Sequence, residues 1–222
     1  MLRATLLLGT ILVLASCGQS DNRQALMDPT SAAMNQQAPD EFKVEFSTSK
    51  GKFVVLVHRE WAPIGADRFY NLVRNGYYDD QRLFRVVPGF VVQFGIHGDP
   101  EIAKLWFSHP QLNPKYHNAV KLKDEPVKQS NKRGTITYAK GGPDSRTTQV
   151  FVNLNDNSRS LDGLGFSPFG EVIEGFENVE AFYGGYGDQT LRRTGEILQQ
   201  GNEFLAKKYP KLDSIQQARI VD

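Results

Sequence analysis

Apolar residues at every second position mark the start of the regular part of the chain. Phe42, Val44 and Phe46 alternate with polar residues, a spacing that predicts a half-buried strand. A second apolar run over residues 53–57 follows turn residues at 49–51, and the two runs together predict a β-hairpin. The folded body is therefore expected to begin with an antiparallel pair of strands.

The spacing of apolar residues then changes to that of a helix. The stretch 62–75 is apolar at positions i, i+3, i+4 and i+7, which are Ala66, Phe69, Tyr70 and Val73. Short apolar runs bounded by turn residues predict further strands at 83–87, 90–94, 135–139, 149–154 and 169–173, and a short helix is expected at 177–183. So many short strands with so few helices favour a closed or nearly closed antiparallel barrel.

Two stretches do not fit a minimal barrel. Residues 98–133 form a long connection, and connections of this length without regular structure are uncommon and often functional. The stretch 191–222 carries four residues at helical spacing, namely Ile197, Gly201, Phe204 and Leu205. They predict a helix of about three to four turns that packs on the barrel. A helix that binds another protein is the alternative.

The first residues have the pattern of a secretory signal. Arg3 precedes an apolar stretch at 6–15, which is too short for a membrane-spanning helix of about 20 residues. The sequence LASC at 14–17 resembles the lipobox of bacterial lipoproteins, which implies cleavage before Cys17 and lipidation of its sulfur. An ordinary signal peptide followed by a chance cysteine is the alternative.

Charge and composition exclude several classes of protein. The 222 residues include 26 Lys and Arg against 25 Asp and Glu, so a nucleic-acid-binding protein with a basic excess is not expected. A single cysteine cannot form an internal disulfide, and with only 4 histidines we expect no metal site. The glycine-rich phosphate-binding loop and the usual hydrolase motifs are absent from the sequence.

One charged residue, Arg85, lies inside an apolar strand run. Its neighbours two positions away are Leu83 and Val87, so an alternating strand would place the arginine on an apolar face. Such an arginine is expected either to pair with an acid or to line a cleft. Gln93, at the end of the next apolar run, raises the same expectation.

The segment around these two residues resembles the signature of the cyclophilin-type peptidyl-prolyl isomerases. Three ordered segments carry the resemblance: 84–95, 134–153, and 161–163 with 169–172. The first of them keeps the family's spacing from Arg85 to Phe90 to Gln93. The resemblance, which runs from about residue 42 to 183, implies a mainly β fold, an eight-stranded antiparallel barrel capped by two helices.

The resemblance also implies which residues form the site. Arg85 and Gln93 would be catalytic, and the residues expected to bind substrate are Phe90, Val91, Ala139, Gln149, Phe151 and Leu161. The implied reaction is rotation about Xaa-Pro bonds, which makes and breaks no covalent bond and so needs neither a cofactor nor a metal. The alternative function is a non-catalytic module of the cell envelope that binds proline-containing peptides or acts as a scaffold.

The chain departs from the family's usual pattern at several positions. Lys140 follows the alanine where many members have asparagine, and Ser160 stands where many have a groove tryptophan. Phe166 is expected to fill the space that the missing tryptophan leaves.

These interpretations divide the chain into four parts. They are a signal peptide at 1–16, the lipidated cysteine and a flexible tether at 17–40, an isomerase domain at 41–188 and a helical extension at 189–222 packed on the barrel. The expected partners are unfolded or exported polypeptides that contain proline, and the membrane through a lipid on Cys17; nucleic acid is not expected, and the protein is expected to be a monomer. The expected location is the periplasmic side of a bacterial envelope, with Gly18 favouring the outer over the inner membrane.

Overall fold

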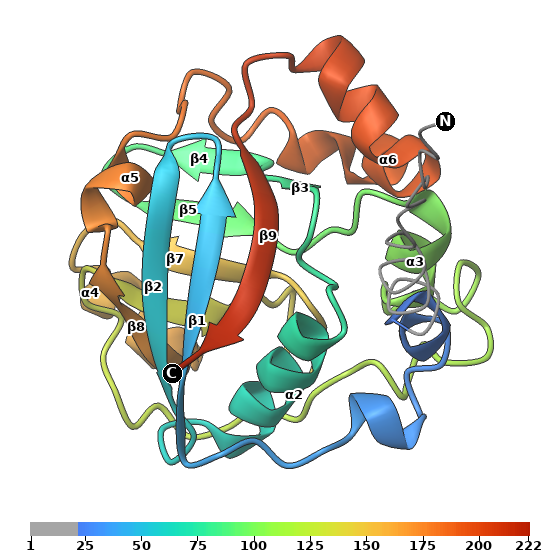
Figure 1. Ribbon diagram of the computed structural model, residues 1–222, viewed down its shortest axis with the longest axis horizontal. Coiled ribbons are helices and arrows are strands. Elements are labelled where there is room, and N and C mark those ends of the chain that lie inside the picture. Colours follow the sequence, from blue (N-terminus) through green and yellow to red (C-terminus); the bar gives the residue numbers. More distant parts are fainter. Residues whose placement is uncertain (1–21) are drawn as a thin grey trace, which may run out of the picture.

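The first predicted hairpin lies at the centre of one wall of the molecule (Figure 1). In the computed structural model, which describes residues 22–222, β1 (Glu41–Thr48) pairs antiparallel with β2 (Gly51–His58), and Val44 is opposite Val55. The alternating residues Phe42, Val44 and Phe46 are buried as expected, because the inner face of the hairpin lies against the core.

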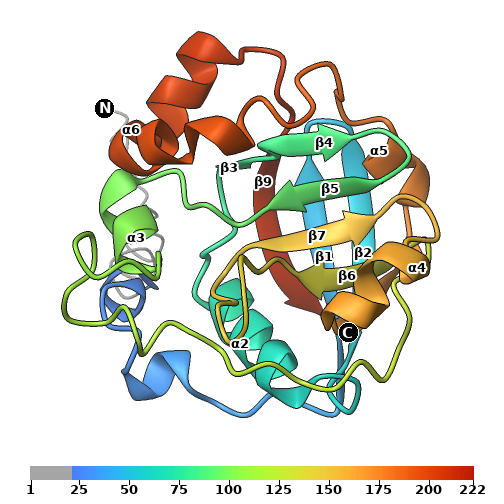
Figure 2. The same ribbon diagram turned by 180° about the vertical axis from the view of Figure 1, so that it is seen from behind.

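The described residues form one antiparallel sheet of nine strands in the order β3-β9-β1-β2-β8-β6-β7-β5-β4. The remaining strands are β3 (Gln81–Arg82), β4 (Arg85–Val87), β5 (Val91–Phe94), β6 (Thr135–Tyr138), β7 (Val150–Asn153), β8 (Pro168–Glu174) and β9 (Ser214–Val221). The sheet curls, and only Leu83 and Phe84 separate its two edge strands along the chain (Figure 2). The expected barrel is thus confirmed, and nine strands replace eight because this break divides one strand in two.

Besides the helical residues 22–26, five helices lie around the sheet within residues 22–222. They are α2 (Pro63–Arg74), α3 (Pro100–Leu105), α4 (Ser158–Leu161), α5 (Phe176–Glu180) and α6 (Thr194–Lys208). Short 3-10 turns occur at η1 (Ala32–Met34), η2 (Asp162–Leu164) and η3 (Leu191–Arg193). The predicted face of α2 is buried, with Ala66, Phe69 and Val73 turned to the core. None of these helices has the length and apolarity that a membrane-spanning segment requires.

Aromatic side chains fill much of the barrel interior. Phe46 stacks on Phe53 with ring centroids 4.7 Å apart and meets Phe94 edge-on at 5.6 Å. Burial of an aromatic or aliphatic side chain of this size contributes roughly 1.5–3 kcal/mol. The rigid interior fixes the positions of the strands whose outer faces carry the candidate site.

The division of the chain at residue 188 into a barrel and a helical extension is wrong. Ser214–Val221 form β9, which pairs with β1 on one side and β3 on the other, so the end of the chain completes the barrel. Only α6 is helical as expected, and it bends at Gly201, where φ is +57°. A Cβ there would lie 1.9 Å from the carbonyl oxygen of Gly98, so this close approach requires glycine.

The expectation of a flexible tether is also wrong for residues 22–40, the part of it that the structure describes. Residues 22–26 are helical, and four residues of the stretch 22–40 are buried, namely Leu26, Pro29, Met34 and Ala38. The indole Nε1 of Trp106 donates to the carbonyl of Leu26 at 2.8 Å, and Asn71 donates to the carbonyl of Gln36 at 2.7 Å. The apolar residues of this stretch have neither helical nor strand spacing, because its buried residues are irregularly spaced along the chain. Cys17 and the predicted signal peptide lie outside the described residues.

The long connection at 98–133 covers the side of the barrel next to α2. It begins with α3, which packs beside α6 in both views (Figures 1 and 2). Trp106 from this connection is buried, and the guanidinium of Arg68 lies 5.0 Å from its ring centroid. The connection therefore belongs to the folded body.

Candidate active site

Strand register places the predicted polar pair and the pocket phenylalanine in one row. Arg85 on β4 is opposite Gln93 on β5, and Gln93 is in turn opposite Phe151 on β7. Their neighbours Val92 and Val152 point into the core, so the alternation of the strands turns the row to the outer face. The local sequence therefore positions this row without the help of a long loop.

Arg85 is held by three neighbouring side chains. Its Nε donates to Oδ1 of Asp188 at 2.6 Å, and its Nη1 donates to Oε1 of Gln93 at 3.0 Å. The guanidinium carbon lies 5.6 Å from the centroid of the Phe90 ring. The side-chain amide of Gln93 donates in turn to Gln149 at 2.9 Å. Both expectations for an arginine in an apolar run hold, since Arg85 pairs with an acid and lines a cleft.

An apolar pocket lies beside this polar row. Val91, Phe151 and Leu161 are buried against one another, and three partly buried residues pack on them, namely Phe90, Ala139 and Phe166. Phe166 meets Phe151 edge-on with ring centroids 5.8 Å apart, so it forms part of the pocket wall. Such an enclosure of aromatic and branched side chains suits a small apolar ring.

The eight predicted site residues all line one groove of about 810 Å³. The groove also has walls that the sequence did not indicate: Phe107, Ser108 and Lys121 from the connection at 98–133, and Leu191 and Thr194 from the segment before and into α6. These residues carry no motif, and only the fold brings them to the groove.

Ser160 does not lie where the comparison with the groove tryptophan placed it. Its hydroxyl donates to the carbonyl of Asn157 at 3.0 Å, and the residue is exposed outside the groove lining. Lys140, by contrast, lines the groove, with its ammonium 2.9 Å from Oδ2 of Asp124 and 5.5 Å from the Phe166 ring centroid.

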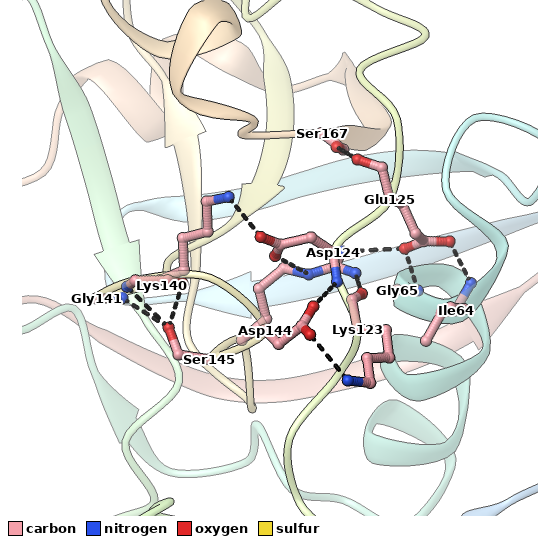
Figure 3. Close-up of polar contacts among 12 residues, drawn as sticks. Ile64, Gly65, Lys123, Asp124, Glu125, Lys140, Gly141, Asp144, Ser145 and Ser167 are labelled. Atoms are coloured by element: carbon pink, nitrogen blue, oxygen red, sulfur yellow. Dashed lines mark hydrogen bonds and ion pairs between the residues drawn. The ribbon is translucent and has the colours of Figure 1, made fainter.

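A network of charged groups holds this wall of the groove (Figure 3). Glu125 accepts hydrogen bonds from the backbone N–H groups of Ile64 and Gly65, at 2.6 and 3.0 Å, at the start of α2. The same carboxylate lies 3.0 Å from Nη1 of Arg146, whose Nη2 donates to the carbonyl of Lys123. The network therefore fastens the loop between β6 and β7 to the connection at 98–133.

A more exposed part of the network lies at its edge. Asp144 accepts from Nζ of Lys123 at 2.9 Å and from the backbone N–H of Asp124 at 2.7 Å. Both hydrogen bonds lower the pKa of the Asp144 carboxyl, and the bond from Lys123 has the larger effect. Asp144 is thus kept ionised in a backbone conformation with φ of +52°.

Comparison with known proteins assigns this groove and fold to a family. The family model for the cyclophilin-type peptidyl-prolyl cis-trans isomerases matches residues 43–200. The chain belongs to the cyclophilin family. The predicted family and enzyme class are therefore confirmed, and proline-containing peptides are the substrates of that class.

Relatives of this cyclophilin include two bacterial peptidyl-prolyl cis-trans isomerases. The protein from Acinetobacter baylyi is 32% identical over 141 residues, which are 62% of this chain and 69% of the relative. Isomerase B of Escherichia coli K12 is 30% identical over 148 residues, 64% of this chain and 84% of the relative. A crystal structure of a cyclophilin-type isomerase from Cryptosporidium parvum has a TM-score of 0.55 at 19% identity, covering 82% of this chain and 98% of that chain. This last likeness concerns the fold.

Proposed function

We propose that this cyclophilin isomerises Xaa-Pro bonds of exported or envelope proteins, with Arg85 as the group that stabilises the twisted imide. The observation that supports it is the row of Arg85, Gln93 and Phe151 beside an apolar pocket in a single groove. The charged donor on β4 and the pocket residues on β5 and β7 lie on three successive strands of the sheet, so one proline residue can touch both.

Rotation about the Xaa-Pro bond needs a hydrogen-bond donor and a pocket that excludes water, but no nucleophile. Resonance opposes rotation of the peptide bond with a barrier of about 18–20 kcal/mol, and uncatalysed Xaa-Pro exchange takes tens to hundreds of seconds. In the twisted state the proline nitrogen loses conjugation and becomes a better hydrogen-bond acceptor. The Arg85 guanidinium donates to it, and this interaction is stronger in the transition state than in the planar ground state.

The apolar side chains have a separate role. Phe151, Leu161 and Val91 grip the proline ring while the preceding carbonyl group turns, and they exclude water, which favours the planar amide. Shortening the exchange time from about 100 s to about 10 ms requires about 5.5 kcal/mol of transition-state stabilisation. One charged donor in a sheltered groove together with desolvation of the ring can supply an amount of this order.

Exchange NMR on a proline-containing peptide tests whether the protein is an enzyme or only a binding module. Catalytic amounts of the wild-type protein are expected to produce exchange cross-peaks between the cis and trans forms, which the free peptide lacks on the same timescale. Chemical-shift changes of the peptide without exchange cross-peaks would identify a non-catalytic binding module and overturn the proposal.

We further propose that a lipid on Cys17 anchors the protein to a bacterial membrane facing the periplasm. The support is the lipobox-like sequence at 14–17 together with the position of the only cysteine in the chain. Since residues 22–26 are helical and Leu26 is buried, at most five Cα–Cα steps of about 3.6 Å each separate Cys17 from the first described residue of the body. The groove would therefore work close to the bilayer, on clients that emerge at or near it.

Replacing Cys17 by serine is expected to abolish lipid attachment completely. Mass spectrometry of the wild-type protein from a bacterial membrane fraction should find an N-terminal peptide that starts at residue 17 and carries a diacylglycerol and an acyl chain. Each buried methylene contributes about 0.8 kcal/mol, so several chains hold the protein firmly. Ser20→Ala is the matched control and should keep the lipid. An unmodified Cys17, or a mature chain that starts elsewhere, would contradict the anchor.

A further inference from the structure

The segment between α5 and α6 runs beside β4 and is fixed to it on both sides of Arg85. Gly187 forms an antiparallel bridge with Val86, and the hydroxyl of the buried Thr190 donates to the carbonyl of Phe84. The chain between these two fixed points contains Asp188. Its carboxylate is thus placed beside the guanidinium by backbone contacts that do not depend on the ion pair itself.

The contact leaves part of the guanidinium free. Arginine has five N–H donors, of which Asp188 takes the one on Nε and Gln93 takes one on Nη1. Three donors therefore remain for a ligand in the groove. Asp188 holds Nε and Gln93 holds Nη1. These two hydrogen bonds together fix the orientation of the guanidinium plane.

The exposure of the pair argues against a role in stability. The side chains of Arg85 and Asp188 are 18% and 51% exposed, and ion pairs this open to water contribute little to folding. The side chain of an unrestrained arginine, however, samples many rotamers, and fixing it before the reaction removes that entropic cost from the chemical step.

We propose that Asp188 is a positioning residue that holds Arg85 in its catalytic orientation. The inference rests on the proposed role of Arg85, and it assigns to the segment at 184–190 a function in the reaction as well as in the fold. Asp188 touches the guanidinium but does not itself line the groove, so it acts only through the arginine.

The first test is the activity of Asp188→Ala. Its kcat/KM in the exchange assay should be about fivefold lower than that of the wild type, the size of effect expected for a half-exposed charged partner. Asp188→Glu should recover part of the loss, and the melting temperature should stay unchanged. Glu45→Gln is the matched control, because it removes a surface ion pair with Lys52 (2.8 Å) that is remote from the groove, and it should remain fully active.

The second test separates positioning from a structural role. If Asp188 acts through Arg85, Asp188→Ala should cause no further loss in an Arg85→Ala background. Raising the salt concentration should lower wild-type kcat/KM towards the value of Asp188→Ala, which itself should be insensitive to salt. The side-chain Nε–H signal of Arg85 in NMR spectra should be protected from exchange in the wild type and lose that protection in Asp188→Ala.

The outcomes distinguish the two proposals. If Arg85→Ala is as active as the wild type, the arginine mechanism fails and the role of Asp188 fails with it. If Arg85→Ala is impaired but Asp188→Ala is as active as the wild type, only the positioning role is overturned. A further loss from Asp188→Ala in the Arg85→Ala background would also overturn it, since the aspartate would then act on something other than the arginine.

Discussion

Replacing Arg85 by alanine is expected to lower kcat/KM for Xaa-Pro isomerisation at least tenfold. The substitution removes a charged donor that lies beside the apolar pocket, and loss of a donor that acts mainly in the transition state typically costs about 10²–10³ in rate at a fully enclosed site. The side chain of Arg85 is 18% exposed and so not fully enclosed, and we therefore place the lower limit at about tenfold. Exchange NMR on the peptide used above measures the effect directly.

A matched arginine elsewhere in the chain controls for this experiment. Arg133 also pairs with an acid, Glu180 at 2.8 Å, and lies 4.0 Å from the centroid of the Phe176 ring, but it does not line the groove. Arg133→Ala should keep full activity. Both variants should keep the circular dichroism spectrum of the wild type, because each arginine extends from the surface of the barrel. Equal activity of Arg85→Ala and Arg133→Ala would refute the mechanism.

The row of site residues could be predicted because it is encoded locally. Arg85, Gln93 and Phe151 lie on short strands whose alternation and signature spacing are visible in the sequence, and antiparallel register then brings them together. For these residues, neighbours in the sequence determine the side chain's direction.

The parts that could not be predicted depend on contacts between distant segments. Asp188 lies in a glycine-rich turn, and only the bridge of Gly187 to Val86 brings it beside an arginine that is 103 positions away in the chain. The strand β9 alternates poorly, with two adjacent exposed residues in its middle, so its sequence did not suggest a barrel strand. Residues 22–40 likewise pack without any periodicity. The periodic spacing of apolar residues reveals an element only when its residues are buried at regular intervals. None of these three segments is buried in that regular way.

The buried network in Figure 3 shows how the groove depends on such distant contacts. The side chains of Glu125 and Arg146 are only 5% and 2% exposed, and each is the main charged partner of the other. Glu125 also satisfies two backbone N–H groups that start α2, while Ser167 donates to its carbonyl at 2.6 Å. Removal of one buried charge leaves its partner uncompensated in a medium of low polarity, which is more costly than replacing both.

Glu125→Ala is therefore expected to lower the free energy of unfolding by about 3–5 kcal/mol, because it leaves Arg146 buried without its carboxylate. For a domain of this size that corresponds to a fall in melting temperature of roughly 6–20 °C, measurable by calorimetry. The double variant Glu125→Leu/Arg146→Met should recover most of the loss, since it removes both charges and keeps the volume. Lys123→Ala, which breaks the exposed ion pair with Asp144 in the same network, should leave the melting temperature nearly unchanged. If Glu125→Ala melted no lower than Lys123→Ala, the buried pair would not be what holds this wall of the groove.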